Sequence, residues 1–160
     1  MRILFLHSSS DMYGASKILL ITLEMLKKNG HKPLVVLSED GLLSQALKKE
    51  HIEVRFIKLG IIRRKYFNFK GLINRFRTLW IAKNQLTELC IQENIDLIYS
   101  NTGAVIVGSW VARKCRLKHV FHIHEIIQSP SWFAFLIHKM IARNVDHVIA
   151  VSGAVKDHLS

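Results

Sequence analysis

Short apolar segments alternate with longer amphipathic segments along the whole chain. The first segment, 2–7, is an almost continuous apolar run, which is the pattern of a strand buried on both faces. From Ala15 the apolar residues recur at helical spacing, and Gly30 is placed to end that helix in a left-handed conformation. The same alternation continues to the end of the chain. It predicts strands at 2–7, 33–37, 53–59, 96–100, 119–124 and 146–151.

The remaining helices are predicted between these strands. Asp40 can cap a helix over 41–49, and apolar residues that include Phe76 and Trp80 predict a long helix that ends near Asn94. Further helices are predicted at 105–114, from Ser129-Pro130 to near Asn144, and after a capping Ser152. Strands that alternate with helices imply right-handed crossovers and a parallel sheet. We therefore expect an α/β fold, a doubly wound, mostly parallel Rossmann-like sheet of about six strands with helices on both faces. The strand order does not follow from the pattern.

The composition is that of one ordered globular domain. The 160 residues are 49% hydrophobic and 22% charged, and they contain no repeat and no interdomain linker. Cys90 and Cys115 lie in predicted helices without metal-ligand spacing, so we expect buried thiols in a reducing compartment. No signal peptide is recognisable, and the apolar runs are too short to span a bilayer. A cytoplasmic domain is expected.

The net charge of +11 comes from one part of the chain. Between Val54 and Thr87 there are nine basic residues and no acidic one, whereas the rest of the chain has fourteen basic and twelve acidic residues. Such a local excess of positive charge predicts a local, negatively charged partner.

The loops after the strands hold the candidate chemistry, because ligands of open parallel sheets bind at the carboxyl ends of the strands. In the first loop, Gly14 and Ala15 open a helix, where backbone N–H groups and the helix dipole favour a phosphate. The alternative is that Gly14 only makes the turn. The loop does not match G-x-G-x-x-G, which argues against dinucleotide binding. No G-K-[ST] loop is present in the sequence, which argues against a nucleotide triphosphatase.

Polar residues follow two later strands. Strand alternation places His122 and His124 on one face, with Glu125 just beyond the end of the strand. A histidine there can bind a hydroxyl or phosphate and exchange protons near neutral pH, or it can be purely structural. Asn101 and Thr102 follow the fourth strand and suit sugar hydroxyls, although such residues are also ordinary in turns.

Taken in order, these motifs resemble the amino-terminal half of glycosyltransferase family 4, which comprises retaining enzymes of the GT-B fold. The matching segments are the opening strand 1–6, the loop 13–15, the Gly-His pair 30–31, the strand and polar end 95–101, the His-Ile-His-Glu segment 122–125 and the strand 147–152. The resemblance covers essentially the whole chain, 1–160. It implies half of a GT-B fold, with the carboxyl-terminal donor-binding domain absent from this chain.

The resemblance also implies how a nucleotide-sugar donor is bound. Gly14 and Ala15 would offer backbone N–H groups to the donor diphosphate. His124, with Glu125 beside it, would be the catalytic group that reaches the transferred sugar or its phosphate. The resemblance predicts no cofactor and no metal, because GT-B enzymes share the property of needing no metal.

On the acceptor side, the resemblance assigns Asn101 and Thr102 to the lining of the site. Tyr13 occupies the place of one of the two glycines that the family normally has in the first loop. It would give the acceptor pocket an aromatic edge. The implied activity is transfer of a hexosyl-type sugar, with retention, to a lipid-linked, membrane-associated or polysaccharide acceptor of the cell envelope. A fragment with only one of the two halves is expected to be inactive.

The basic stretch suggests where the protein works. Basic residues next to aromatic ones are typical of the headgroup boundary of an anionic membrane, which predicts a peripheral position at the inner face. The residues expected to make this contact are Arg63, Arg64, Lys65, Phe67 and Phe69. Nucleic acid is not expected as a partner, since no nucleic-acid motif accompanies the charge. The alternatives to an enzyme are a non-catalytic nucleotide-binding domain and a Rossmann-like scaffold at a membrane surface.

Overall fold

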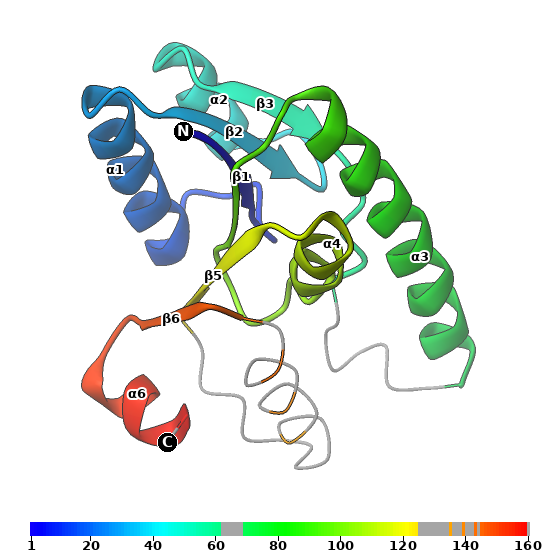
Figure 1. Cartoon of the computed structure of the whole chain (residues 1–160). Coiled ribbons are helices and arrows are strands. Elements are labelled where there is room, and N and C mark those ends of the chain that lie inside the picture. The colour runs from blue at the N-terminus through cyan, green and yellow to red at the C-terminus, as the bar shows by residue number, and fades with distance from the viewer. Residues whose placement is uncertain (62–68, 125–134, 136–138, 140–142, 144, 160) are drawn as a thin grey trace.

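The centre of the protein is a six-stranded parallel sheet with the strand order β3-β2-β1-β4-β5-β6 (Figure 1). The computed structural model describes residues 1–61, 69–124 and 145–159, together with 135, 139 and 143. The strands are β1 (Arg2–Leu6), β2 (Lys32–Leu37), β3 (Glu53–Phe56), β4 (Leu97–Ser100), β5 (Lys118–Ile123) and β6 (His147–Ala150). All the predicted strands are present, and the order now shows that β1 lies between β2 and β4.

Helices cover both faces of the sheet, as predicted. They are α1 (Gly14–Lys28), α2 (Leu42–Lys49), α3 (Phe69–Gln92), α4 (Val107–Cys115) and α6 (Gly153–Leu159). Phe5 of β1 packs in one apolar cluster with residues of α1 and α2, among them Leu19. Its neighbour Leu4 packs in a second cluster with residues of α3 and α4, among them Leu86. Successive side chains of a strand point to opposite faces, so α1 and α2 lie on one face and α3 and α4 on the other.

Two of the predicted helix ends are confirmed. Gly30 has a φ of +79°, and its N–H donates to the carbonyl of Lys27 over 3.0 Å, which ends α1 in the left-handed conformation. The hydroxyl of Ser152 accepts the N–H of Val155 over 3.3 Å and so caps α6. The helix predicted between Ser129 and Asn144 lies mainly outside the described residues.

One predicted strand boundary is wrong. Strand β3 ends at Phe56 rather than at residue 59, because the chain then turns across the sheet edge and the Leu59 N–H bonds to the hydroxyl of Ser38. Phe76 and Trp80 lie on the exposed side of α3, where they are 69% and 65% exposed, which excludes the alternative that they are core residues. The buried face of α3 carries smaller side chains instead: Leu79, Ala82, Leu86 and Cys90.

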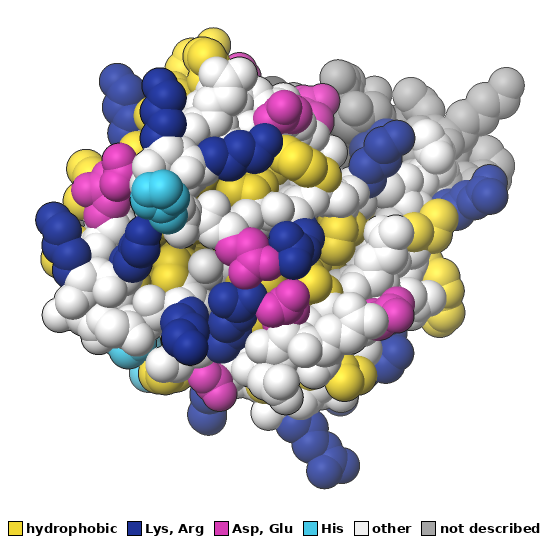
Figure 2. All heavy atoms as spheres, turned by 90° about the horizontal axis from the view of Figure 1, so that it is seen from above, with side chains coloured by type: hydrophobic (Ala, Val, Ile, Leu, Met, Phe, Trp, Pro, Cys, Tyr) yellow, Lys and Arg dark blue, Asp and Glu magenta, His cyan; other side chains and the backbone are white. Residues whose placement is uncertain are grey.

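The described residues include both cysteines and part of the basic stretch. Cys90 is a buried free thiol, and burial raises its pKa to about 12, whereas Cys115 is half-buried and also free. Of the basic stretch, Arg55 is paired with Glu53 over 2.5 Å. On the face shown in Figure 2, Lys and Arg side chains are spread among acidic and hydrophobic ones. No helix in the part of the chain that the structure describes is long and apolar enough to cross a membrane.

Candidate functional site at the switch point of the sheet

The strand order creates a crevice between β1 and β4. The chain leaves β1 for α1 on one face and leaves β4 for α4 on the other, so the two loops separate at the carboxyl edge of the sheet. This is the position at which doubly wound sheets bind their ligands. The residues directly after the two strands, His7 and Asn101, lie buried at this point.

One amide side chain connects three strands at this point. The Asn101 side-chain nitrogen lies 3.0 Å from His7 Nδ1 and 3.3 Å from the carbonyl oxygen of Ala15. Its oxygen lies 3.2 Å from His124 Nε2, just beyond β5. Since the amide nitrogen must donate to the Ala15 carbonyl, the amide oxygen faces His124 and accepts its Nε2–H. Asn101 thus joins the start of α1 to His124.

His7 accepts a hydrogen bond from the Asn101 amide and so helps to hold it in place. With the Asn101 nitrogen donating to Nδ1, the hydrogen of the His7 ring is on Nε2 and is donated to the hydroxyl of Ser16 over 2.9 Å. His7 is only 1% exposed. Burial lowers the pKa of His7 to about 4, and a positive charge on His124 would lower it further, against a smaller opposing effect of the Asn101 carbonyl. His7 is therefore neutral at physiological pH and holds Asn101 in one orientation.

A second buried pair lies beneath His124. The rings of His122 and His124 are in contact, with centroids 4.0 Å apart and planes tilted by 39°, which confirms that the two side chains share a face. Tyr99 and His122 Nδ1 are 2.8 Å apart, and burial raises the pKa of the Tyr99 hydroxyl to about 12. Burial and the charge of His124 lower the pKa of His122 to about 4. The phenol therefore donates to a neutral imidazole, which fixes the surface against which His124 rests.

The expected phosphate loop lies on the other side of Asn101. The first helical hydrogen bond of α1 runs from the Lys17 N–H to the carbonyl of Tyr13, so the N–H groups of Gly14 and Ala15 precede the hydrogen-bonded ladder. A side chain at Gly14 would meet no atom within 4 Å, so a ligand can approach the backbone there. Tyr13 is 73% exposed at the same helix start. The structure brings Ala15 close to the Asn101–His124 pair.

The two polar residues expected on the acceptor side are buried. Asn101 is 1% and Thr102 is 3% exposed. The Thr102 hydroxyl donates to the Ser8 hydroxyl over 3.3 Å, and so links the loop after β4 to the loop after β1. Both side chains hold the walls of the crevice in place, and their contact with an acceptor stays a prediction.

Several predicted site residues cannot be placed. Glu125 lies outside the described residues, as do Arg63, Arg64, Lys65 and Phe67. Phe69 begins α3, but its side chain is not described either.

Sequence reasoning missed His7, Ser16 and Tyr99 as members of the site. A signal for His7 was available, because it is a histidine that ends an otherwise apolar strand at the ligand-binding edge of the sheet. Nothing in the sequence shows that Ser16 would pair with His7, or that Tyr99 would pair with His122. Among the described residues, no group of three or more His, Cys, Asp or Glu side chains is placed to hold a metal ion.

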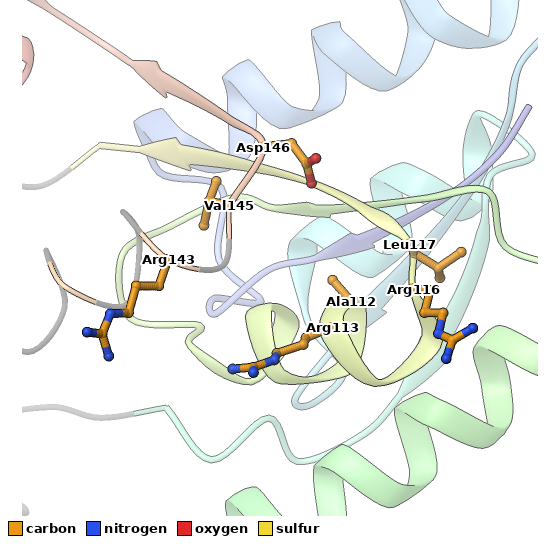
Figure 3. A pocket seen from close by; sticks show the side chains of 7 residues that line it. All are labelled: Ala112, Arg113, Arg116, Leu117, Arg143, Val145 and Asp146. Carbon is orange, nitrogen blue, oxygen red and sulfur yellow. The ribbon is translucent and has the colours of Figure 1, made fainter.

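A separate hollow of about 560 Å³ lies at the opposite edge of the sheet, before β5 and β6. Figure 3 shows that Arg113 and Arg143 extend to one side of it and Arg116 to the other, so their guanidinium groups do not converge. The carboxylate of Asp146 is held by Lys118 over 2.6 Å. The charged side chains that line this hollow therefore do not converge on one ligand position.

The topology and the switch-point crevice define a Rossmann-like domain of the kind that forms one half of a GT-B glycosyltransferase. HepE of Anabaena, solved in complex with UDP-glucose, matches with a TM-score of 0.77 and 23% identity over 99% of this chain and 40% of its own. A glycosyltransferase from Rickettsia africae matches with a TM-score of 0.70 and 22% identity, over 99% and 38% of the two chains. MurG of Acinetobacter baumannii gives 0.67 and 14%, over 94% and 41%. At these identities the likeness shows the fold.

The family follows from the sequence itself. The sequence model of Glycosyltransferase Family 4 matches residues 12–160, and the chain therefore belongs to that family. No curated protein matches the chain. The chain spans about 40% of the length of the solved structures named above.

Proposed function

We propose that this chain is the acceptor-side domain of a retaining glycosyltransferase, which transfers a sugar from a nucleotide-sugar donor to a lipid-linked or polysaccharide acceptor. The observation that carries the proposal is the amide of Asn101, which holds His124 and the start of α1 on either side of the switch-point crevice. A donor diphosphate at Gly14 and Ala15 would then have its sugar beside His124. The choice of a nucleotide sugar as donor is supported by HepE, which was solved with UDP-glucose.

In this proposal His124 contacts the donor and Asn101 positions it. An imidazole whose Nε2–H is held by an amide keeps its ring orientation, so that its other edge can face a sugar hydroxyl or phosphate. Gly14 and Ala15 contribute backbone N–H groups at the positive end of α1, and no metal is needed for this role. The rest of the donor would be held by a carboxyl-terminal domain, without which transfer does not occur.

Sugar transfer by the protein with both domains tests the role of His124. We expect His124→Ala to lower kcat roughly a hundredfold, because a positioned polar group is lost from the reacting centre. The thermal midpoint should change little, since His124 is at the end of β5 and only partly buried. The exposed His147 provides the control, and His147→Ala should retain normal activity. Normal turnover in His124→Ala would leave a non-catalytic nucleotide-binding domain as the better description.

We further propose that the domain contacts an anionic membrane through α3 and the basic stretch before it. Phe76 and Trp80 are four residues apart and exposed on one side of α3. Lys83 Nζ lies 5.2 Å from the centroid of the Trp80 ring, so cationic and aromatic groups are interleaved there. Exposed aromatic rings beside basic residues are suited to the lipid headgroup region. This contact would place the acceptor site at the inner face of the membrane.

Vesicle sedimentation tests the membrane contact. The wild type should bind vesicles that contain anionic lipid, more weakly as salt rises, and should bind neutral vesicles little. Replacing both Phe76 and Trp80 with Ser should reduce that binding severalfold. Ile21 and Met25 form a matched control pair, since they are also exposed and four residues apart, on α1. An equal loss of vesicle binding in both double variants would show that nonspecific adsorption of apolar side chains, rather than a contact through α3, caused the binding.

A further inference from the structure

A hollow of about 520 Å³ lies beside the switch point, over the carboxyl ends of β1, β2 and β3. Ser8 comes from the loop after β1, Ser38 and Glu39 follow β2, and Lys58 follows β3. The side of the hollow is formed by α3, through residues that include Arg75. The hollow thus gathers polar residues from four elements that are far apart in the sequence.

The wall between β3 and α3 is fixed by close packing. Gly60 has a φ of +66°, and a Cβ at that position would lie 2.8 Å from Cγ of Leu79, so the loop backbone rests directly on α3. The N–H of Ile57 donates to the carbonyl of Leu37 over 2.9 Å and continues the contact with β2. Leu59, between them, is fully buried. The shape of the hollow is therefore set by the fold rather than by surface side chains.

The hollow adjoins the candidate site. The Ser8 hydroxyl at its edge accepts a hydrogen bond from Thr102, the neighbour of Asn101. A ligand in the hollow would therefore lie next to the crevice that has His124 on one side and the start of α1 on the other. In a transferase that uses this crevice for the donor, the adjoining hollow is where an acceptor hydroxyl could approach the reacting carbon.

The lining suits an acidic sugar. The hydroxyls of Ser8 and Ser38 each accept a hydrogen bond from the protein, from Thr102 and from the Leu59 N–H, so their own hydrogens can be donated to a ligand. The carboxylate of Glu39 can accept hydrogen bonds from sugar hydroxyls. The two cations, Lys58 and Arg75, both come from the stretch between Val54 and Thr87 that has no acidic residue.

We propose that this hollow binds the acceptor sugar, and that the acceptor carries a phosphate or carboxylate group held by Lys58 and Arg75. The inference rests on the proposed function, because the hollow is assigned to the acceptor only if the adjoining crevice holds the donor. It adds the chemical class of the acceptor, a negatively charged sugar, and the residues that select it. The neutral part of the sugar is held by the serine hydroxyls and Glu39.

Amide chemical shifts of the 160-residue chain test the proposal, with glucuronic acid, glucose 6-phosphate and glucose as probes, and UDP as a separate ligand. Both acidic sugars should shift the amides of Lys58 and Gly60, and glucose should do so several times more weakly. Lys58→Gln should weaken binding of the acidic sugars about fivefold, as expected for loss of one exposed ion pair. Arg77→Gln is the matched control, because Arg77 is an exposed cation of the same stretch that does not line the hollow.

Each outcome distinguishes this inference from the proposed function. Equal binding of glucose and the acidic sugars, or an equal loss in Lys58→Gln and Arg77→Gln, would overturn selection by charge. Shifts confined to Gly14 and Ala15 with UDP, and none near Lys58 with any sugar, would overturn the acceptor hollow and leave the proposed function standing. Absence of UDP shifts at Gly14 and Ala15 would instead count against the donor site itself. The two acidic probes also tell whether carboxylate or phosphate is preferred.

Discussion

Acid should destabilise this domain through His7. The side chain is 1% exposed and neutral, and its pKa is lowered from the ordinary value of 6.5 to about 4, mainly by burial. Above pH 6.5 the imidazole is neutral in both the folded and the unfolded chain, so its contribution to stability is fully present. Below that pH the unfolded chain binds a proton that the folded chain does not, and stability falls until the folded pKa is reached.

The size of the effect follows from the two pKa values. A lowering from 6.5 to about 4 corresponds in full to about 3 kcal/mol of unfolding free energy, at about 1.4 kcal/mol per pKa unit. Between pH 7 and pH 5 His7 becomes protonated in the unfolded chain but stays mostly neutral in the folded chain. The resulting loss of unfolding free energy is about 2 kcal/mol. His122 is also lowered to about 4 and adds to the acid sensitivity of the wild type. The contribution of His7 must therefore be measured as a difference between variants.

Urea unfolding of the wild type and of His7→Gln at pH 7 and pH 5 measures that difference. Glutamine can keep a donor near Ser16 but does not titrate, so the variant should be less stable at pH 7 and less sensitive to acid. The unfolding free energy of His7→Gln should fall about 2 kcal/mol less than that of the wild type. His147→Gln, at the exposed start of β6, is the control and should lose as much unfolding free energy between pH 7 and pH 5 as the wild type does. Equal acid sensitivity of wild type and His7→Gln would refute the buried neutral imidazole.

Two further substitutions test the packing around the site by urea unfolding. Gly60→Ala should destabilise the domain by about 2 kcal/mol, because φ is +66° and the new Cβ would overlap Leu79, while Gly14→Ala should be nearly neutral. If the unfolding free energy of Gly60→Ala equals that of the wild type, the loop can move away from α3 at no cost. Tyr99→Phe should cost about 1–2 kcal/mol, since it removes the donor to His122. No loss there would mean that His122 finds another partner.

The fold was predictable because its signals are local. Apolar runs, the left-handed Gly30 and the cap at Ser152 are each determined by a few neighbouring residues, and each is found as predicted. The shared face of His122 and His124 was predictable for the same reason, since strand alternation fixes it over three residues.

The rest depends on contacts between distant segments. Helical spacing alone left open whether Phe76 and Trp80 face the core or a lipid surface. In the structure α3 packs on the sheet through Leu79 and Ala82 and leaves the two aromatic rings exposed. Which of several apolar faces is buried depends on the neighbouring helix and on the sheet, and neither is encoded in the spacing. The pairing of Tyr99 with His122 likewise depends on the adjacency of β4 and β5, which follows from the strand order.

The strand order also explains why Asn101 can couple the parts of the site. Because β1 and β4 are adjacent although ninety-four residues separate His7 from Asn101, one amide reaches the ends of β1 and β5 and the start of α1 at once. An aspartate there would lose the N–H donors to Ala15 and His7, whereas a leucine would lose all three contacts. The amide can therefore donate to Ala15 and accept from His124 in the same position. Its geometry places the start of α1 and the imidazole of His124 at the same crevice.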